Sequence, residues 1–192
     1  MRDHPFHRRI GNLVSGLGLT HGKQIWLDKA CGGEGLIPLY EATGSEGVPF
    51  CFVDILLLLE GRLVIIEIEE SDVKPLHLLG KFYASAFSTH FNDQDISKLP
   101  LLFIQVLDTS RINLEEGQKS GQWDRVEAIL KGQAEKWLGR KAQYRLLWGR
   151  QDDFGAGGKE SEKLLNLVKE WTYGDMVWEN DLVDSDTSCP TS

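Results

Sequence analysis

Apolar and polar residues alternate along this chain in runs whose spacing predicts helices and strands in turn. Apolar runs bounded by glycine, proline or charged residues predict strands over 23–30, 50–59, 62–70, 99–108 and 142–149, with a shorter strand in 36–42. Apolar positions at helical spacing predict helices over 6–19, 75–91, 121–138 and 159–172. We therefore expect an α/β fold in which a mixed central sheet is flanked by helices on both faces.

The stretch 50–70, FCFVDILLLLEGRLVIIEIEE, clearly belongs to the core, yet it contains carboxylates. A two-residue hairpin turn at 60–61 would place Asp54 opposite Glu67, with Cβ atoms about 5 Å apart. Glu69 would project from the same face as Glu67, because side chains alternate along a strand. The sequence therefore predicts that three carboxylates converge at one end of a buried hairpin.

Carboxylates at this range repel one another, and burial raises the free energy of their charged forms further. A divalent cation would relieve both costs. Oxygen ligands without a nearby histidine or cysteine suit Mg²⁺, Mn²⁺ or Ca²⁺ rather than Zn²⁺. In the alternative, Glu67, Glu69 and Glu70 lie at a solvated strand end and Asp54 caps a local turn. The predicted register favours the metal site, and a slip of one residue would remove the argument.

This pattern resembles the PD-(D/E)xK nuclease superfamily, which includes many type II restriction endonucleases. The resemblance rests on Asp54, on Glu67-Ile68-Glu69 at the end of an apolar strand, and on the helix and buried strand that follow. It spans residues 6–108, whose predicted elements match the restriction endonuclease-like αβββαβ core of that family. It implies metal-dependent hydrolysis of phosphodiester bonds, with Mg²⁺, or Mn²⁺ in its place, bound by Asp54, Glu67 and the backbone carbonyl of Ile68.

Two residues depart from the family's pattern. Val53 stands where the family often has proline, and Glu69 stands where it usually has a lysine that positions or activates the attacking water. A few restriction enzymes resemble this chain in using Glu-x-Glu, and Glu69 would then act as a general base or as a ligand to a second ion. Lys74 or Lys81 could supply the missing positive charge. Some nucleases of this fold take a catalytic basic residue from the helix that contains Lys81, although an ordinary solvated lysine is the alternative.

Charge is unevenly distributed along the chain, whose net charge is −8. Residues 173–192 hold five acids and no base, and we interpret them as an acidic tail after a single nuclease-like domain over 1–172. Residues 118–150 hold eight bases against three acids. Because lysine and arginine make most phosphate contacts, this segment is the predicted DNA-binding region, although a solvated helix face has the same pattern. The predicted contacts are Lys119, Arg125, Lys131, Arg140 and Lys141.

No apolar run reaches the roughly 20 residues that span a bilayer, and the first residues lack a signal-peptide pattern, so we expect no membrane partner. The three cysteines are widely spaced, which is typical of a reducing cytoplasm. We expect a cytoplasmic, Mg²⁺-dependent endonuclease of double-stranded DNA, either type II restriction-like or the catalytic subunit of a restriction enzyme. It would act as a homodimer or with a sequence-reading partner subunit. The alternatives are a non-catalytic binding or regulatory protein with the nuclease fold and an acidic inhibitor that binds a basic partner through its tail.

Overall fold

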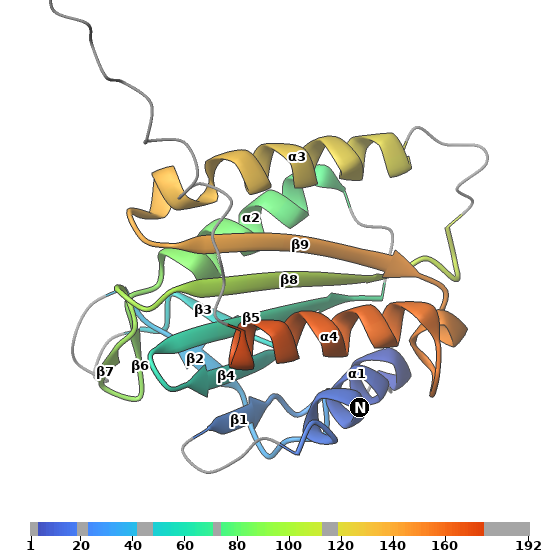
Figure 1. The fold of residues 1–192 in the computed structure, drawn as a ribbon, viewed down its shortest axis with the longest axis horizontal. Helices are drawn as coiled ribbons and strands as arrows, with labels where there is room; N and C mark the ends of the chain where they lie inside the picture. The colour runs from blue at the N-terminus through green and yellow to red at the C-terminus, as the bar shows by residue number, and fades with distance from the viewer. Residues whose placement is uncertain (1–3, 19–22, 42–47, 71–73, 113–118, 175–192) are drawn as a thin grey trace, which may run out of the picture.

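A computed structural model describes residues 4–18, 23–41, 48–70, 74–112 and 119–174 (Figure 1). The helices are α1 (Pro5–Ser15), α2 (Pro75–Phe87), α3 (Lys119–Leu138) and α4 (Lys159–Tyr173), with a short 3₁₀ helix η1 (Gln151–Phe154). The strands are β1 (Gln24–Leu27), β2 (Ile37–Leu39), β3 (Cys51–Val53), β4 (Ile55–Leu59), β5 (Arg62–Glu69), β6 (His90–Phe91), β7 (Gln94–Asp95), β8 (Leu101–Asp108) and β9 (Ala142–Gly149). None of the described helices is long and apolar enough to cross a membrane.

The central sheet has five strands in the order β1-β4-β5-β8-β9. The pairs β1–β4 and β4–β5 are antiparallel, whereas β5–β8 and β8–β9 are parallel. All residues of β8 are buried, and so are most of those of β5, as expected for continuous apolar runs inside a sheet covered on both faces. Two short ribbons, β2–β3 and β6–β7, accompany this sheet.

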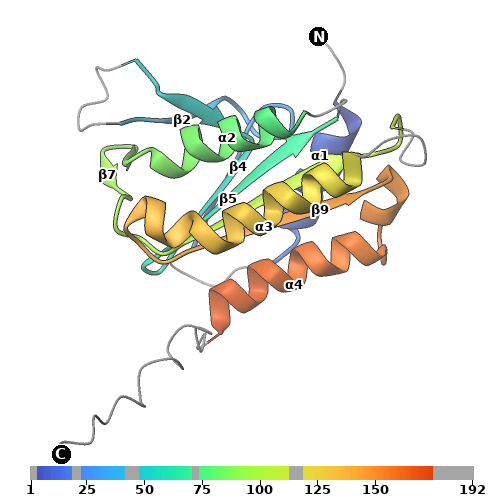
Figure 2. The same cartoon turned by 90° about the horizontal axis from the view of Figure 1, so that it is seen from above.

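Helices cover both faces of the sheet, which confirms the predicted α/β class. The helices α2 and α3 lie on one face, and α1 and α4 lie on the other (Figures 1 and 2). Each face has its own apolar cluster, with Ile65 and Phe82 on the α2–α3 side and Phe6 and Ile66 on the α1–α4 side. Successive residues of β5 therefore face different helix layers, as alternation along a strand requires.

The predicted strand 50–59 is interrupted at Asp54, which corrects the prediction of one continuous strand. Its first part is β3, which pairs with β2 in a separate ribbon, and its second part is β4. At the break, the Asp54 carbonyl accepts a hydrogen bond from the Asp28 amide at 2.9 Å. The Asp54 carboxylate accepts another, from the Ile68 amide, at 2.7 Å. The first bond continues the β1–β4 register by one position, whereas in the second a side chain takes the place of a backbone acceptor beside β5.

The predicted register is confirmed between β4 and β5. Leu59 pairs with Arg62, and the same register continues through five pairs from the turn at 60–61. The ladder ends at Ile55–Ile66, one position before Asp54, so the predicted pairing of Asp54 with Glu67 is not part of it. The two carboxylates approach each other through a shared side-chain partner instead.

Some element boundaries also differ from the predicted ones. The helix predicted over 75–91 ends at Phe87, and the chain then forms the β6–β7 ribbon. Asn92 and Asp93 make its turn at positive φ, which these two residue types tolerate better than most. The predicted tail 173–192 overlaps the end of α4, and its residues from 175 onward lie outside the described residues.

Candidate active site

The carboxyl end of β5 is where the predicted catalytic residues meet. The strand β4 begins there, β5 and β8 end there, and α1 and α2 begin nearby (Figure 1). In open α/β sheets, ligand sites commonly lie outside the carboxyl ends of the strands. Alternation along the end of β5 directs Glu67 and Glu69 toward α2 and Glu70 toward α1.

Lys81 of α2 is the common partner of the three predicted acids. Its Nζ lies 3.0 Å from Glu67 Oε2, 2.9 Å from Glu69 Oε1 and 3.8 Å from Asp54 Oδ2. Lys74, the other candidate lysine, is exposed at the N-cap of α2, about two helical turns away. We call Asp54, Glu67, Glu69 and Lys81 the carboxylate cluster.

Glu67 is the most buried acid of the carboxylate cluster, with a side-chain exposure of 2%. Ser85 donates a hydrogen bond to its Oε1 at 2.9 Å, and Lys81 donates one to its Oε2 at 3.0 Å. Burial nevertheless raises the pKa of Glu67 to about 8, because the Lys81 ammonium offsets only part of the desolvation and the Asp54 charge adds to it. The protein alone therefore does not fully stabilise the charged form of Glu67.

Lys81 responds to the same surroundings in the opposite sense. Burial would lower the pKa of its ammonium, but the charges of Glu67, Asp54 and Glu69 outweigh burial and raise this pKa. Lys81 therefore stays protonated at neutral pH. It is a fixed positive charge and a hydrogen-bond donor in the cluster, and it is not a proton acceptor.

The carboxylate cluster has the composition of a site for a hard divalent cation. With all four groups ionised, three carboxylates and one ammonium leave two negative charges uncompensated. A cavity of about 330 Å³ lies beside it, and Ile68, Glu69, Lys81 and Arg111 are among its lining residues. Carboxylate oxygens around an excess of negative charge are the donors that Mg²⁺ and Mn²⁺ prefer, so the residue types fit such an ion. The three carboxylates surround the Lys81 ammonium, and their oxygens do not all lie within 4.8 Å of one another, so an ion would enter only with side-chain movement.

Asp54 is held in place by backbone and side chains from two directions. Its Oδ2 accepts the Ile68 amide hydrogen bond at 2.7 Å, which orients the carboxylate at the edge of β5. Its Oδ1 lies 3.8 Å from His7 Nε2 on the α1 side. Asp54 therefore lies between the carboxylate cluster and the first turn of α1. The role of the Ile68 carbonyl as a metal ligand stays a prediction.

Glu70 fixes the start of α1 on the other side of β5. Its Oε1 accepts hydrogen bonds from the amides of Phe6 and His7 at 2.9 and 3.0 Å, which satisfies two of the amides that a helix leaves unpaired in its first turn. His7 Nδ1 lies 3.0 Å from the same oxygen, and His4 Nδ1 lies 3.5 Å from Oε2. We call His4, His7 and Glu70 the imidazole cluster.

Two opposing effects set the pKa of Glu70. Burial raises it, but the hydrogen bonds from the side chain and backbone of His7, together with the histidine charges, outweigh burial and lower the pKa. Sequence reasoning did not bring Glu70 together with His4 and His7. Strand alternation after Glu69 and the three-residue spacing of the histidines on one helix face were the available signals.

Arg140, one of the predicted DNA contacts, is buried and has a structural role, so this prediction is corrected. Its guanidinium donates hydrogen bonds to the carbonyls of Ile96 at 2.5 Å, Leu99 at 3.2 Å and Ala86 at 2.7 Å. Ala86 belongs to the last turn of α2, where unpaired carbonyls attract a cation. Burial lowers the pKa of Arg140 to about 10, although the Asp95 charge opposes this. The guanidinium is therefore committed to backbone carbonyls.

The other predicted DNA contacts are spread along and beyond α3. Arg125 is exposed, and Lys131 is exposed and pairs with Glu127 at 2.8 Å. The helix α3 begins at the end of the sheet where β5 and β8 end, and it runs about 30 Å toward the opposite end (Figure 1). Lys119 thus begins α3 at the end where the carboxylate cluster lies, whereas Lys141 lies at the far end. Their contact with DNA stays a prediction.

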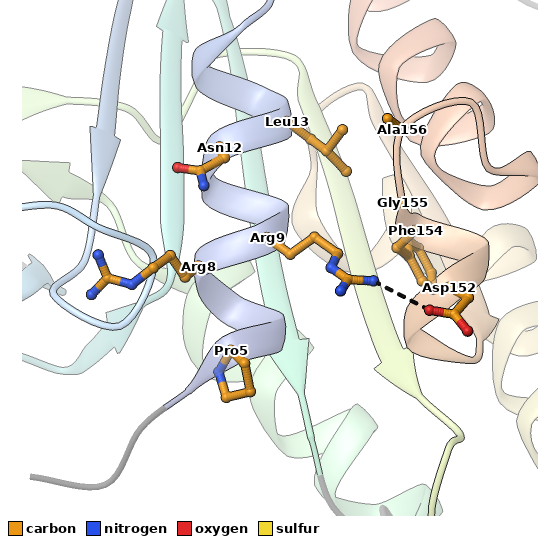
Figure 3. A pocket seen from close by; sticks show the side chains of 9 residues that line it. All are labelled: Pro5, Arg8, Arg9, Asn12, Leu13, Asp152, Phe154, Gly155 and Ala156. Carbon is orange, nitrogen blue, oxygen red and sulfur yellow. Dashed lines mark ion pairs between the residues drawn. The ribbon is translucent and has the colours of Figure 1, made fainter.

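A larger hollow of about 750 Å³ lies between α1 and η1 (Figure 3). It shares Pro5 with the cavity at the carboxylate cluster. Arg9 donates a hydrogen bond to the Gln151 carbonyl and lies 3.9 Å from Asp152. Figure 3 shows the guanidinium groups of Arg8 and Arg9 on opposite sides of α1. The two arginines therefore do not form a joint anion site.

Comparisons of the chain with protein-family models, with curated proteins and with solved structures find no match.

Proposed function

We propose that this chain is a divalent-metal-dependent endonuclease that hydrolyses phosphodiester bonds of DNA, either as a type II restriction-like enzyme or as the catalytic subunit of a restriction enzyme. The observation that carries the proposal is the position of Lys81 Nζ, 2.9 to 3.8 Å from three carboxylates beside a cavity. The PD-(D/E)xK motif needs a lysine next to its acids. In this chain α2 supplies one where the strand has Glu69.

The order of elements supports the same proposal. The elements α1, β1, β4, β5, α2 and β8 follow one another in the chain, with the β2–β3 ribbon inserted between β1 and β4 and the β6–β7 ribbon between α2 and β8. Apart from these two ribbons, the order is the αβββαβ order of the superfamily that the sequence resembles. The two acids Glu67 and Glu69 lie at the end of its third strand, as the resemblance implies.

Each residue has a distinct role in the proposed reaction. Asp54 and Glu67 would hold the metal with the Ile68 carbonyl, and the Ile68 amide orients Asp54 for this task. When bound, Mg²⁺ or Mn²⁺ would supply Lewis-acid polarisation of the phosphate. Lys81 would stabilise the negative charge that develops on the phosphate oxygens. Glu69 would accept the proton of the attacking water or contribute to a second ion.

We extend the proposal to the substrate and the assembly. Arg111 is exposed on the lining of the cavity, where it would contact a phosphate next to the scissile one. One carboxylate cluster would hydrolyse a phosphodiester bond in one DNA strand at a time. Cleavage of both strands therefore calls for a homodimer or for a partner subunit that also reads the sequence.

Cleavage of supercoiled plasmid by the purified chain tests the proposal. The wild type, Asp54→Asn and Glu67→Gln are incubated with Mg²⁺, Mn²⁺ or a chelator, and Asp124→Asn on the exposed face of α3 is the matched control. We expect metal-dependent nicking or linearisation that is lost in the first two variants and kept in the control. No cleavage by the wild type with either ion, or equal cleavage by Asp54→Asn, would overturn the proposal.

A non-catalytic binding or regulatory protein is the second candidate. The ion pairs of Lys81 favour it in one respect, because they already offset part of the charge and join α2 to β5. Such a static brace predicts no stabilisation by divalent cations, whereas a metal site predicts a higher melting temperature in their presence. The idea of an acidic inhibitor depends on 173–192, almost all of which lies outside the described residues.

A further inference from the structure

We propose that the imidazole cluster, His4, His7 and Glu70, is a second cation site that binds a borderline transition metal such as Zn²⁺ or Co²⁺. One donor atom from each residue lies within 4.8 Å of the other two. Two imidazoles and one carboxylate are donors that these ions prefer, whereas the carboxylate cluster offers oxygen ligands alone. The inference concerns binding and holds whether or not the carboxylate cluster cleaves DNA.

The local structure explains why the three residues come together. Pro5 begins α1, so His4 and His7 lie three residues apart across its first turn, and their ring centroids are 5.2 Å apart. Glu70 follows directly on β5 and projects toward this turn. The site is therefore held by the end of a central strand and the start of a helix.

Two separations between donor atoms are close to those around one ion, each measured to a different oxygen of Glu70. Ligands about 2.0–2.1 Å from a tetrahedral zinc ion lie about 3.3 Å from one another. In the structure, His7 Nδ1 lies 3.0 Å from Glu70 Oε1 and His4 Nδ1 lies 3.5 Å from Glu70 Oε2. A cation would enter with small side-chain movements, and His7 would exchange its hydrogen bond to Glu70 for the ion.

Capping of α1 and cation binding can use different oxygens of Glu70. The amides of Phe6 and His7 both donate to Oε1. Oε2 faces His4 and accepts no hydrogen bond from the described residues. Both His4 and Glu70 also line the 330 Å³ cavity, which gives an ion a route from solvent. The capping bonds therefore do not prevent binding.

His7 already has the surroundings of a metal-binding histidine. It is 9% exposed, with Nδ1 toward Glu70 and Nε2 3.8 Å from Asp54 Oδ1. A carboxylate near the far nitrogen of a ligating histidine fixes the ring and makes it a better ligand. Asp54 would serve in this way for the imidazole cluster while belonging to the carboxylate cluster.

Titration of the full-length chain with Co²⁺, followed by its visible absorption, tests the inference. Excess Mg²⁺ keeps the oxygen ligands of the carboxylate cluster occupied, and Glu67→Gln/Glu69→Gln removes that cluster in a parallel titration. We expect one Co²⁺ per chain in both cases. His4→Ala and Glu70→Gln should weaken binding at least about tenfold, and Glu70→Gln keeps an acceptor oxygen for the α1 amides.

His77→Ala is the matched control, because His77 is exposed on α2 and far from this turn in the sequence. It should bind Co²⁺ as the wild type does. Melting temperatures without metal, measured for every variant, identify any loss of binding that comes from unfolding. No Co²⁺ absorption in the wild type, or unchanged affinity in folded His4→Ala and Glu70→Gln, would overturn the inference. Neither result depends on plasmid cleavage, so the proposed function stands or falls separately.

Discussion

Arg140 is a buried cation and Lys81 is a partly exposed one, and their partners differ in kind. The Arg140 guanidinium lies against neutral backbone carbonyls, one of them at the end of α2. The Lys81 ammonium lies among three carboxylates at the end of β5. Both side chains join α2 to other parts of the molecule. The two sites differ in net charge, because the partners of Arg140 are neutral and those of Lys81 are acids.

The arginine site supplies hydrogen-bond acceptors but no adjacent counter-charge, whereas the lysine site holds more negative charge than its one ammonium neutralises. Backbone carbonyls accept the hydrogen bonds of the Arg140 guanidinium, and burial still lowers its pKa to about 10. The carboxylate cluster keeps an excess of negative charge, and Glu67 has a raised pKa as a result of its burial and the neighbouring Asp54. A buried cation with neutral partners thus indicates a structural role, whereas a partly exposed cation with surplus acids beside a cavity indicates a site.

Removal of a carboxylate from the carboxylate cluster should lower the rate of plasmid cleavage more than any other substitution. Asp54→Asn or Glu67→Gln removes a proposed metal ligand, and we expect plasmid cleavage to fall by roughly 10³-fold or more, since charge stabilisation of this kind dominates such rates. Initial cleavage rates in Mg²⁺ measure the loss. Asp124→Asn should cleave at the wild-type rate, and a loss there as large as in Asp54→Asn would contradict the assignment.

Replacement of Lys81 should have a smaller effect on cleavage. Lys81→Met leaves the acids in place but removes the donor that faces the phosphate, and we expect a fall on the order of 100-fold. Lys163→Met is the control, because Lys163 also pairs with a glutamate on a helix surface, at 2.6 Å from Glu160. Equal cleavage rates for Lys81→Met and the wild type would show that Lys81 has only a structural role, joining α2 to β5.

Replacement of Arg140 should change stability and leave the chemistry intact. Arg140→Met removes the hydrogen bonds of the guanidinium to three carbonyls, and we expect the free energy of unfolding to fall by about 3 kcal/mol. Urea denaturation measures it, with Arg125→Met on the exposed face of α3 as a control expected to change by less than about 0.5 kcal/mol. Metal-dependent cleavage per folded molecule should be unchanged. If cleavage falls while stability does not, Arg140 belongs to the functional site.

The pH dependence of stability should report the incomplete charge balance at Glu67. Its pKa is raised from the ordinary 4.5 to about 8, so the folded chain holds this proton more tightly than the unfolded chain. This proton stabilises the folded chain fully below about pH 4.5, and the stabilisation is lost as the pH rises through about 8. Glu67→Gln should flatten this decline in metal-free melting curves, because Lys81 stays charged throughout. Parallel declines in the two proteins would assign the effect to another group.

The sequence predicted what local rules determine. The turn at 60–61 set the register of the hairpin, and alternation placed Glu67 and Glu69 on one side of β5. The end of the β4–β5 ladder before Asp54 was not predictable, because the Asp54 carboxylate there binds the amide of Ile68, which is distant in the chain.

Basic residues were harder to assign from the sequence. Lys81 was the predicted catalytic lysine and Lys74 the other candidate, and only the position of α2 against β5 brings Lys81 to the acids. Arg140 was taken for a DNA contact because a buried arginine whose partners are backbone carbonyls has no sequence signature. The roles of Lys81 and Arg140 both depend on tertiary packing, which cannot be inferred from the pattern of charges along the chain.

The melting temperature of the chain with and without Ca²⁺ tests the central claim most directly, because Ca²⁺ fills an oxygen site and needs no substrate. At about 100 times the dissociation constant, binding adds about 2.7 kcal/mol, a shift of roughly 5–10 °C for a chain of this size. We predict this shift for the wild type and for His4→Ala, and none for Asp54→Asn/Glu67→Gln. An unshifted wild type, or an equal shift in the double variant, would contradict a metal site between Asp54 and Glu67.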